Sequence, residues 1–324
     1  MVEDGGTERA PGAKRKALLK WGRIGVTVAA VAYLVSRVEP RDVVDAFKRL
    51  SPGAALLAVL VVLLGLFCGM IRWRLLLRAY GAIDLPSWPR TAHLYFVGHF
   101  YNTYAPGGVG GDVIRGVAGR KAFGDLDWAA ATSGVAVVFI ERVIGVAALL
   151  VLAASAYLLR PIPGMESVGL WATLGIGAAA AALVGIAIAP KLAPHLPESL
   201  GKPLRALPQL RSALPFFGAV LLSLVIHTVN IVAGHAIMHS LEPSVTLAES
   251  AVVMPLIGAS AFFPLTVGGA GVREAAFALL YGTVGVPEAT AYAGSLAFWA
   301  TQLLTAGIGG IVNMVVPLSG TDRA

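Results

Sequence analysis

Long apolar runs separated by short polar connections dominate the chain. The runs are close to or above the roughly 20 residues that a helix needs to cross a bilayer, and they lack the polar–apolar alternation of barrel strands. They lie at about 17–36, 53–71, 128–159, 168–189, 214–240 and 288–316. Because backbone groups inside hydrocarbon must be satisfied within their own segment, these runs predict transmembrane helices.

Two further apolar stretches are too short to cross a membrane, and each ends at a break rich in proline and glycine. The first, about 91–104, reaches Pro106 and resumes as a half-helix at 111–123. The second, about 250–263, breaks at Pro264 and also resumes. Broken backbone at membrane depth is tolerated only inside protein or beside a water-filled cavity, so both stretches predict re-entrant elements. The predicted fold class is an all-α integral membrane protein with about eight membrane segments.

Composition excludes a soluble domain. The 324 residues are 57% hydrophobic and only 13% charged, whereas soluble domains carry about 25% charged residues. The net charge of +7 would suggest nucleic acid in a soluble protein. Here the basic residues flank apolar runs, so membrane orientation and anionic lipid explain them, and we expect no nucleic-acid partner. The single cysteine, Cys68, excludes an intramolecular disulfide and a cysteine-based metal cluster.

Basic residues predict the orientation of the first span. Five of them precede or open the run at about 17–36, namely Lys14, Arg15, Lys16, Lys20 and Arg23. This excess places the N-terminus in the cytoplasm of a multi-pass protein in the cytoplasmic membrane. The run lacks a small-residue cleavage site and predicts a retained helix rather than a signal peptide. Residues 41–50 predict an amphipathic interfacial helix, and three arginines at 72, 74 and 78 are expected to follow the next span on the cytoplasmic side.

The predicted organisation is one polytopic domain with short ends. Residues 1–16 are polar and predict a disordered cytoplasmic N-terminus, and 318–324 form a short tail. Between them, 17–317 form the transmembrane domain, with one half at about 53–123 and a second at about 214–283.

The two halves share a sequence skeleton at their breaks. Both follow the pattern P-x-x-V-G-G-x-x-x-R, which runs from Pro106 to Arg115 and from Pro264 to Arg273. Three predicted spans separate the copies, so the copies enter the membrane from opposite sides. Corresponding interrupted segments in inverted halves indicate a transport site near the membrane midplane. If 128–159 were instead a re-entrant pair, the copies would face the same side.

The skeleton carries the chemistry of an anion site. Glycine pairs let another group approach the backbone, and a half-helix that begins after them presents free N–H groups. Arginine adds a planar fork suited to phosphate. The candidate substrate-binding residues are Arg115, Arg273, Gly110, Gly111, Gly268, Gly269 and Asn102. The alternative is a glycine hinge whose arginines are neutralised by neighbouring acids, with Asn102 satisfying freed backbone groups.

Four charged residues are candidates for charge pairing or coupling. Asp112 lies three positions before Arg115, where it could pair with that arginine or cap the half-helix. Glu274 directly follows the second arginine of the repeat. Glu141 and Arg142 interrupt the run at 128–159 and are either a self-neutralising pair or a gate.

Other polar residues predict little chemistry. His227 and Asn230 share one helix face, and His235 and His239 share another, which we interpret as interhelical hydrogen bonding. We expect no metal because no carboxylate lies nearby in sequence to complete a ligand set. No nucleotide fingerprint or Ser/His/Asp order is present, so we expect no cofactor and no enzymatic activity.

Four groups of residues together resemble one known family. They are Arg72-Trp-Arg74, the block from Asn102 to Arg115, Glu141-Arg142, and the block from Pro264 to Glu274. As a set they look like the lysylphosphatidylglycerol synthase transmembrane-region family, a flippase-like membrane domain, over about 17–317. The resemblance implies a domain of about eight segments that handles a charged or glycosylated lipid. Family members with synthase activity continue into a large cytosolic domain, whereas only 318–324 follow the last predicted span here, so we expect a stand-alone member without that activity.

The sequence-based hypothesis is a lipid flippase-like transporter that moves or binds an anionic or lipid-linked headgroup. The expected partners are membrane lipids, either phospholipid or polyprenyl-linked lipid, and a separate soluble transferase in one variant of the hypothesis. Two alternatives stay open. One is a membrane-embedded subunit or enzyme of lipid-linked glycan or aminoacyl-lipid modification, and the other is a small-solute transporter. The lipid, the direction and coupling of transport, and the oligomeric state have no signal in the sequence.

Overall fold

The computed structural model describes residues 39–105, 108–124, 128–195, 197–198, 208–260 and 271–316. This part of the chain is all-helical and contains no strand. The elements are α2 (Pro40–Lys48), α3 (Pro52–Ala79), α4 (Trp88–Tyr104), α5 (Gly110–Gly119), η1 (Arg120–Phe123), α6 (Trp128–Leu159), α7 (Glu166–Leu192), η2 (Ala193–His195), α9 (Ala213–Leu241), α10 (Leu247–Ser260), α11 (Val272–Gly282) and α12 (Glu288–Val315). The predicted first span at about 17–36 lies outside the described residues.

Four helices in the described part are long and apolar enough to cross a membrane. They are Pro52–Ala79, Ser133–Leu159, Ala213–Leu241 and Glu288–Val315. Their outer faces expose large apolar side chains, as a lipid-facing surface requires, for example Leu56, Leu60 and Leu64 along α3. The prediction of a multi-pass helical membrane protein is therefore confirmed, while the total of about eight segments stays a prediction.

Helix α3 is longer than its predicted span of 53–71. Ser51 caps its start by accepting a hydrogen bond from the Ala54 backbone N–H at 3.1 Å. The helix then continues past Arg72 to Ala79. The expectation that Arg72 would follow the span at the cytoplasmic surface is wrong, because its side chain is buried within the helix bundle. The helix continues because fully buried side chains, among them Trp73, follow this arginine.

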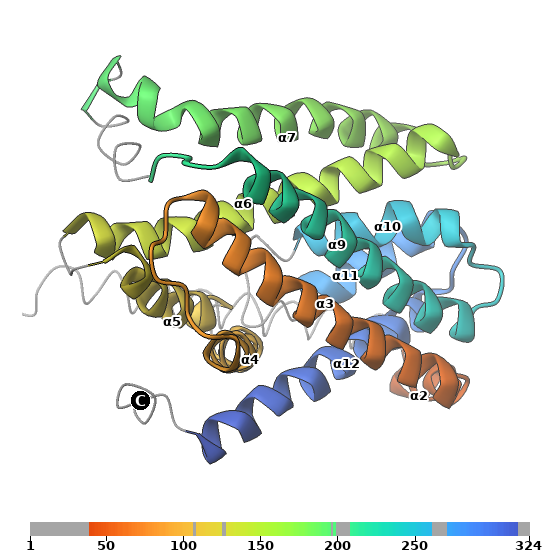
Figure 1. Ribbon diagram of the computed structural model, residues 1–324. Helices are drawn as coiled ribbons and strands as arrows, with labels where there is room; N and C mark the ends of the chain where they lie inside the picture. The colour runs from red at the N-terminus through yellow and green to blue at the C-terminus, as the bar shows by residue number, and fades with distance from the viewer. Residues whose placement is uncertain are drawn as a thin grey trace, which may run out of the picture.

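Helices α3 and α9 lie side by side and antiparallel (Figure 1). At one end the Ser51 backbone N–H donates to Ser240 Oγ at 2.8 Å. At the other end the backbone N–H groups of Arg211 and Ser212 donate to the Ala79 carbonyl at 2.8 and 3.1 Å. The start of each helix thus lies beside the end of the other.

The helices around this pair pack in two corresponding sets. Helix α4 packs on α12, just as α10 packs on α6. Helix α5 packs between α4 and α6, and α11 packs between α10 and α12. Helix α2 precedes α3 and packs on α12, while α7 precedes α9 and packs on α6. Exchanging α2–α6 with α7 and α9–α12 therefore reproduces these helix contacts.

Helix α6 is continuous over its whole length, from Trp128 to Leu159. The alternative in which this run forms a re-entrant pair is thereby excluded. In the described part of the chain, three long helices, α6, α7 and α9, lie between α5 and α10. The first break itself joins α4 to α5, and its Gly108 has a φ of 65°, a backbone conformation that favours glycine.

Small residues allow the first break to close tightly. A Cβ added to Gly111 in α5 would lie only 1.7 Å from the carbonyl oxygen of Gly98 in α4. A Cβ on Gly134 in α6 would lie 2.3 Å from the carbonyl oxygen of Gly116 in α5. Small residues at membrane helix contacts let backbones approach closely, and here they bring three helices together around a polar interior.

Candidate functional site

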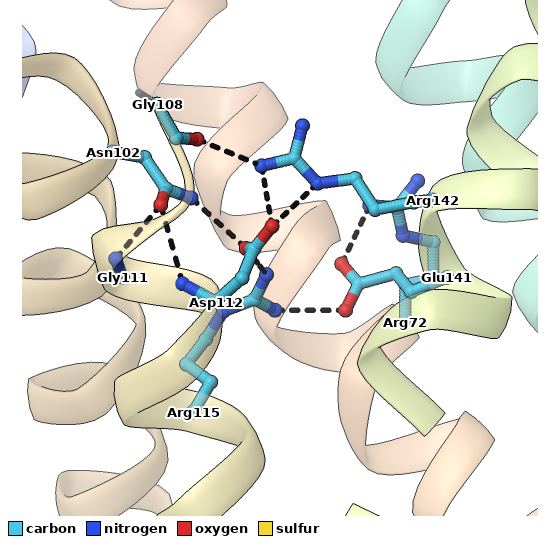
Figure 2. Close-up of polar contacts among 8 residues, drawn as sticks. All are labelled: Arg72, Asn102, Gly108, Gly111, Asp112, Arg115, Glu141 and Arg142. Carbon is cyan, nitrogen blue, oxygen red and sulfur yellow. Dashed lines mark hydrogen bonds and ion pairs between the residues drawn. The ribbon is translucent and has the colours of Figure 1, made fainter. Parts of the chain in front are cut away.

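A chain of ion pairs joins α3, α5 and α6 inside the bundle (Figure 2). Its centre is Glu141 on α6, whose side chain is only 2% exposed. Glu141 Oε1 accepts a hydrogen bond from Arg72 Nη2 at 2.6 Å, and Oε2 accepts one from Arg115 Nη1 at 2.8 Å. One carboxylate therefore connects arginines from two other helices.

Asp112 extends this chain on its other side, between two arginines (Figure 2). Its Oδ1 accepts from Arg115 Nη2 at 2.8 Å, and its Oδ2 accepts from Arg142 Nε at 2.6 Å. Arg142 also donates to the Gly108 carbonyl at 3.4 Å. The cluster of Arg72, Asp112, Arg115, Glu141 and Arg142 is called the charge cluster below.

The charge cluster holds three arginines and two carboxylates, so its formal charge is +1. Buried charges are tolerated when they are paired and hydrogen-bonded. Further partners satisfy the cations: Ser223 Oγ accepts from Arg72 Nη1 at 3.1 Å. The Arg115 guanidinium lies 4.8 Å from the ring centroid of Tyr95 and 5.8 Å from that of Trp73, within the range of cation–π attraction.

Asn102 closes the first break from the end of α4 (Figure 2). Its Oδ1 accepts the backbone N–H groups of Gly111 and Asp112 at 2.8 and 3.2 Å, and its Nδ2 donates to Asp112 Oδ1 at 3.0 Å. The capping contact considered for Asp112 is thus made by Asn102, because the aspartate faces the arginines. Two N–H groups predicted as anion donors are already occupied by this amide.

The second copy of the skeleton has a different arrangement. Arg273 on α11 donates to Glu274 Oε1 and, through Nε at 3.2 Å, to Ser295 Oγ. Its guanidinium lies 5.0 Å from the ring centroid of Trp299. Glu274 also accepts the Gly271 backbone N–H at 2.6 Å. The predicted ligands Gly268 and Gly269 lie outside the described residues.

The arginines of the two copies have different partners. Arg115 and Arg273 are separated by the same number of residues as Glu141 and Trp299, so Trp299 corresponds to Glu141. Arg115 binds the carboxylate of Glu141, whereas Arg273 contacts the aromatic ring of Trp299. Arg115 is held by two acids, whereas Arg273 is paired with its own neighbour Glu274.

Arg273 also lines a cavity of about 210 Å³. Its other polar lining residues are His227 and Asn230 on α9 and Gln302 on α12. His227 Nε2 is buried without a hydrogen-bond partner, and the Asn230 amide donates to the Ile226 carbonyl at 2.9 Å. The remaining lining is apolar, from Leu149, Ile231, Met254, Pro255, Ile257, Gly258 and Phe298. This space is called the Arg273 cavity below.

The spacing of His227 and Asn230 predicts that they share one helix face, but it does not connect them with Arg273 or Gln302. The connection depends on how α9, α11 and α12 pack, and no spacing along the chain reveals it. The second histidine pair has structural partners: His235 Nδ1 lies 3.1 Å from Ser250 Oγ, and His239 Nδ1 lies 3.0 Å from the Val245 carbonyl. Within the described ranges, no group of three or more metal-ligating side chains occurs.

A second, mostly apolar cavity of about 390 Å³ lies between α6 and α7. Arg142 is the one charged residue among its lining residues, which are Phe139, Arg142, Val143, Val146, Ala147, Leu150, Ala178, Ala179 and Ala182. The Arg142 side chain is 37% exposed, so part of it is accessible beside the charge cluster.

Together the spanning helices and the buried charge cluster define a polytopic membrane protein with ionisable residues inside its helix bundle. The chain matches the lysylphosphatidylglycerol synthase TM region family over residues 20–310. It therefore belongs to this family, which links it to lipid modification or transport. No curated protein sequence matches the chain.

Proposed function

We propose that the protein is a lipid flippase-like transporter, which moves or binds an anionic or lipid-linked headgroup across the cytoplasmic membrane. The observation that carries this proposal is the Arg273 cavity, because it places a guanidinium, an imidazole and two amides around one space among helices long enough to span. Such intramembrane polar groups mark substrate pathways in membrane proteins.

We further propose that the two halves are an inverted repeat. The antiparallel contact of α3 with α9 supports this, since corresponding helices then run in opposite directions. The matching packing of α4 on α12 and α10 on α6 supports it as well. In transporters built from inverted repeats, rocking of one half against the other exposes a midplane site to alternate sides.

The two arginines of the repeat have separate roles in this proposal. Arg273 binds the phosphate, because it lines a cavity and is paired with a single acid, its neighbour Glu274. Glu274 neutralises the guanidinium in the empty state and stays paired with it when the substrate phosphate binds the other N–H groups of Arg273. Arg115 holds the first half together or couples its motion, because two carboxylates occupy it. Asn102 supports the same break by capping α5.

Acyl chains need a route along the protein surface, and the exposed apolar faces of the spanning helices supply one. The apolar cavity between α6 and α7 lies on a different face of α6 from the Arg273 cavity, because Leu150 lines the former and Leu149 lines the latter. A small-solute transporter, the second candidate, is favoured by the modest volume of the Arg273 cavity.

Reconstitution of the full chain into liposomes tests the proposal. Fluorescent phosphatidylglycerol in the inner leaflet becomes accessible to an external quencher only if the protein moves it. We expect wild type to move the lipid and Arg273→Ala to lose at least about tenfold in rate, which corresponds to about 1.4 kcal/mol. The matched control is Arg160→Ala, an exposed arginine at the end of α6. Equal rates for wild type and Arg273→Ala would show that Arg273 does not bind the headgroup, and no movement by wild type would favour the small-solute alternative.

A further inference from the structure

The Arg273 cavity has an uneven chemical lining. Its polar groups are one guanidinium, one imidazole and two amides, from Arg273, His227, Asn230 and Gln302. No carboxylate is among the described residues that line it. The neighbouring acid Glu274 is occupied by Arg273, by the Gly271 N–H and by Ser295 Oγ. The segment 261–270, whose placement is not described, contains no Asp or Glu in its sequence.

We infer from this lining that the cavity selects an anionic headgroup rich in hydroxyl groups, such as glycerol or a sugar on a phosphate, over a headgroup that carries an amine. The inference rests on the proposed transport function and specifies its substrate class.

The hydrogen-bonding capacity of the cavity fits hydroxyl groups. A hydroxyl both donates and accepts, and the side-chain amides of Asn230 and Gln302 offer one donor group and one acceptor each. His227 contributes its ring to the lining, while its Nε2 is buried and is not exposed to the cavity. Arg273 supplies the planar donor fork that matches phosphate.

An ammonium group does not fit the same lining. It has three donors and no acceptor, and its charge needs an anionic partner when it leaves water. The guanidinium of Arg273 would add like-charge repulsion. A quaternary ammonium could be held by an aromatic cage instead, but Phe298 is the only aromatic residue among the described lining residues.

The volume is consistent with a headgroup alone. Sites for drug-sized ligands enclose roughly 300–1,000 Å³, and the Arg273 cavity encloses about 210 Å³. The acyl chains would then remain outside the cavity, where the exposed apolar faces of the spanning helices contact lipid.

The test compares lipids that share their acyl chains and differ in headgroup. Proteoliposomes of the full chain carry labelled phosphatidylglycerol, phosphatidylethanolamine, phosphatidylcholine or phosphatidic acid. We expect wild type to move phosphatidylglycerol at least roughly tenfold faster than the two amine-bearing lipids. Substituting Asn230→Leu or Gln302→Leu should slow phosphatidylglycerol more than phosphatidic acid, which lacks the glycerol hydroxyls. Leu150→Ala, on another face of α6, is the control and should leave the ratio unchanged.

Substitutions that add a carboxylate to the cavity should change the ratio of transport rates in favour of the amine-bearing lipid. A misfolded variant would instead lose transport of both lipids. Gln302→Glu keeps the side-chain shape and adds the missing carboxylate, so it should raise the rate for phosphatidylethanolamine relative to phosphatidylglycerol, and Asn230→Asp should act in the same direction. If wild type moves the amine-bearing lipids as fast as phosphatidylglycerol, or if neither acidic variant shifts the ratio, the selectivity inference is wrong while the transport proposal stands. If wild type moves none of the four lipids, the transport proposal itself fails.

Discussion

Replacing Glu141 by glutamine tests whether the charge cluster holds the first half together. The substitution keeps the volume of the side chain but removes a carboxylate that binds Arg72 at 2.6 Å and Arg115 at 2.8 Å. The formal charge of the cluster rises from +1 to +2, and two buried guanidinium groups lose their common counter-charge. Removing one partner of a buried ion pair typically costs about 3–5 kcal/mol. A loss of this size is a large share of the stability of a typical domain.

The measurement is the unfolding of purified protein in detergent, followed by intrinsic fluorescence over increasing denaturant. A matched control is Asp45→Asn, which removes the exposed pair between Asp45 and Lys48, whose side chains are 69% and 71% exposed. Exposed pairs contribute about 0–1 kcal/mol. The double variant Arg72→Gln/Glu141→Gln restores a formal charge of +1, so we expect it to recover part of the lost stability. The reasoning is refuted if Glu141→Gln unfolds no more easily than the Asp45 control.

Two further predictions concern the first break. Gly111→Ala should destabilise the protein strongly, because the added Cβ would lie 1.7 Å from the Gly98 carbonyl oxygen, whereas Gly177→Ala meets no atom within 4 Å and should not; thermal unfolding of both variants in detergent is the comparison. Asn102→Ala removes the cap of α5 and should cost about 0.5–2 kcal/mol, with faster amide hydrogen exchange confined to the first turn of α5. Uniform exchange across all helices would contradict a local capping role.

The fold class could be predicted from the sequence because its cause is local. A long apolar run must form a helix in hydrocarbon wherever it sits, and the predicted bounds of α9 and α12 lie within a residue or two of the observed ones. The break before α5 was also predicted, since proline and glycine act on the backbone directly, and its Gly108 has a positive φ. Helix α3 was predicted too short because Arg72 looks like the end of a span when its partner is unknown.

The partners of the buried charges could not be predicted, because they lie far apart in the chain. Arg72 and Glu141 are separated by 69 positions and meet only when α3 packs on α6. The neighbours Glu141 and Arg142 suggested a pair that neutralises itself. Adjacent residues on a helix point in different directions, so Glu141 binds Arg72 and Arg115 while Arg142 binds Asp112. The same reason hid the Arg273 cavity, whose polar lining comes from three helices.

Trp299 occupies in the second half the place that Glu141 has in the first, and this difference has a consequence for the resting conformation. Two halves with equal interiors would open toward either side of the membrane with equal ease. In the first half Arg115 forms ion pairs with Asp112 and Glu141. In the second half Arg273 contacts the Trp299 ring instead. In a rocking protein, opening the first half would have to separate these charges, and a gap of a few kcal/mol leaves a minor state populated at about 0.1–10%. The resting protein would then face predominantly one compartment, while the net direction of transport would still be set by the lipid gradient or by a coupled energy source.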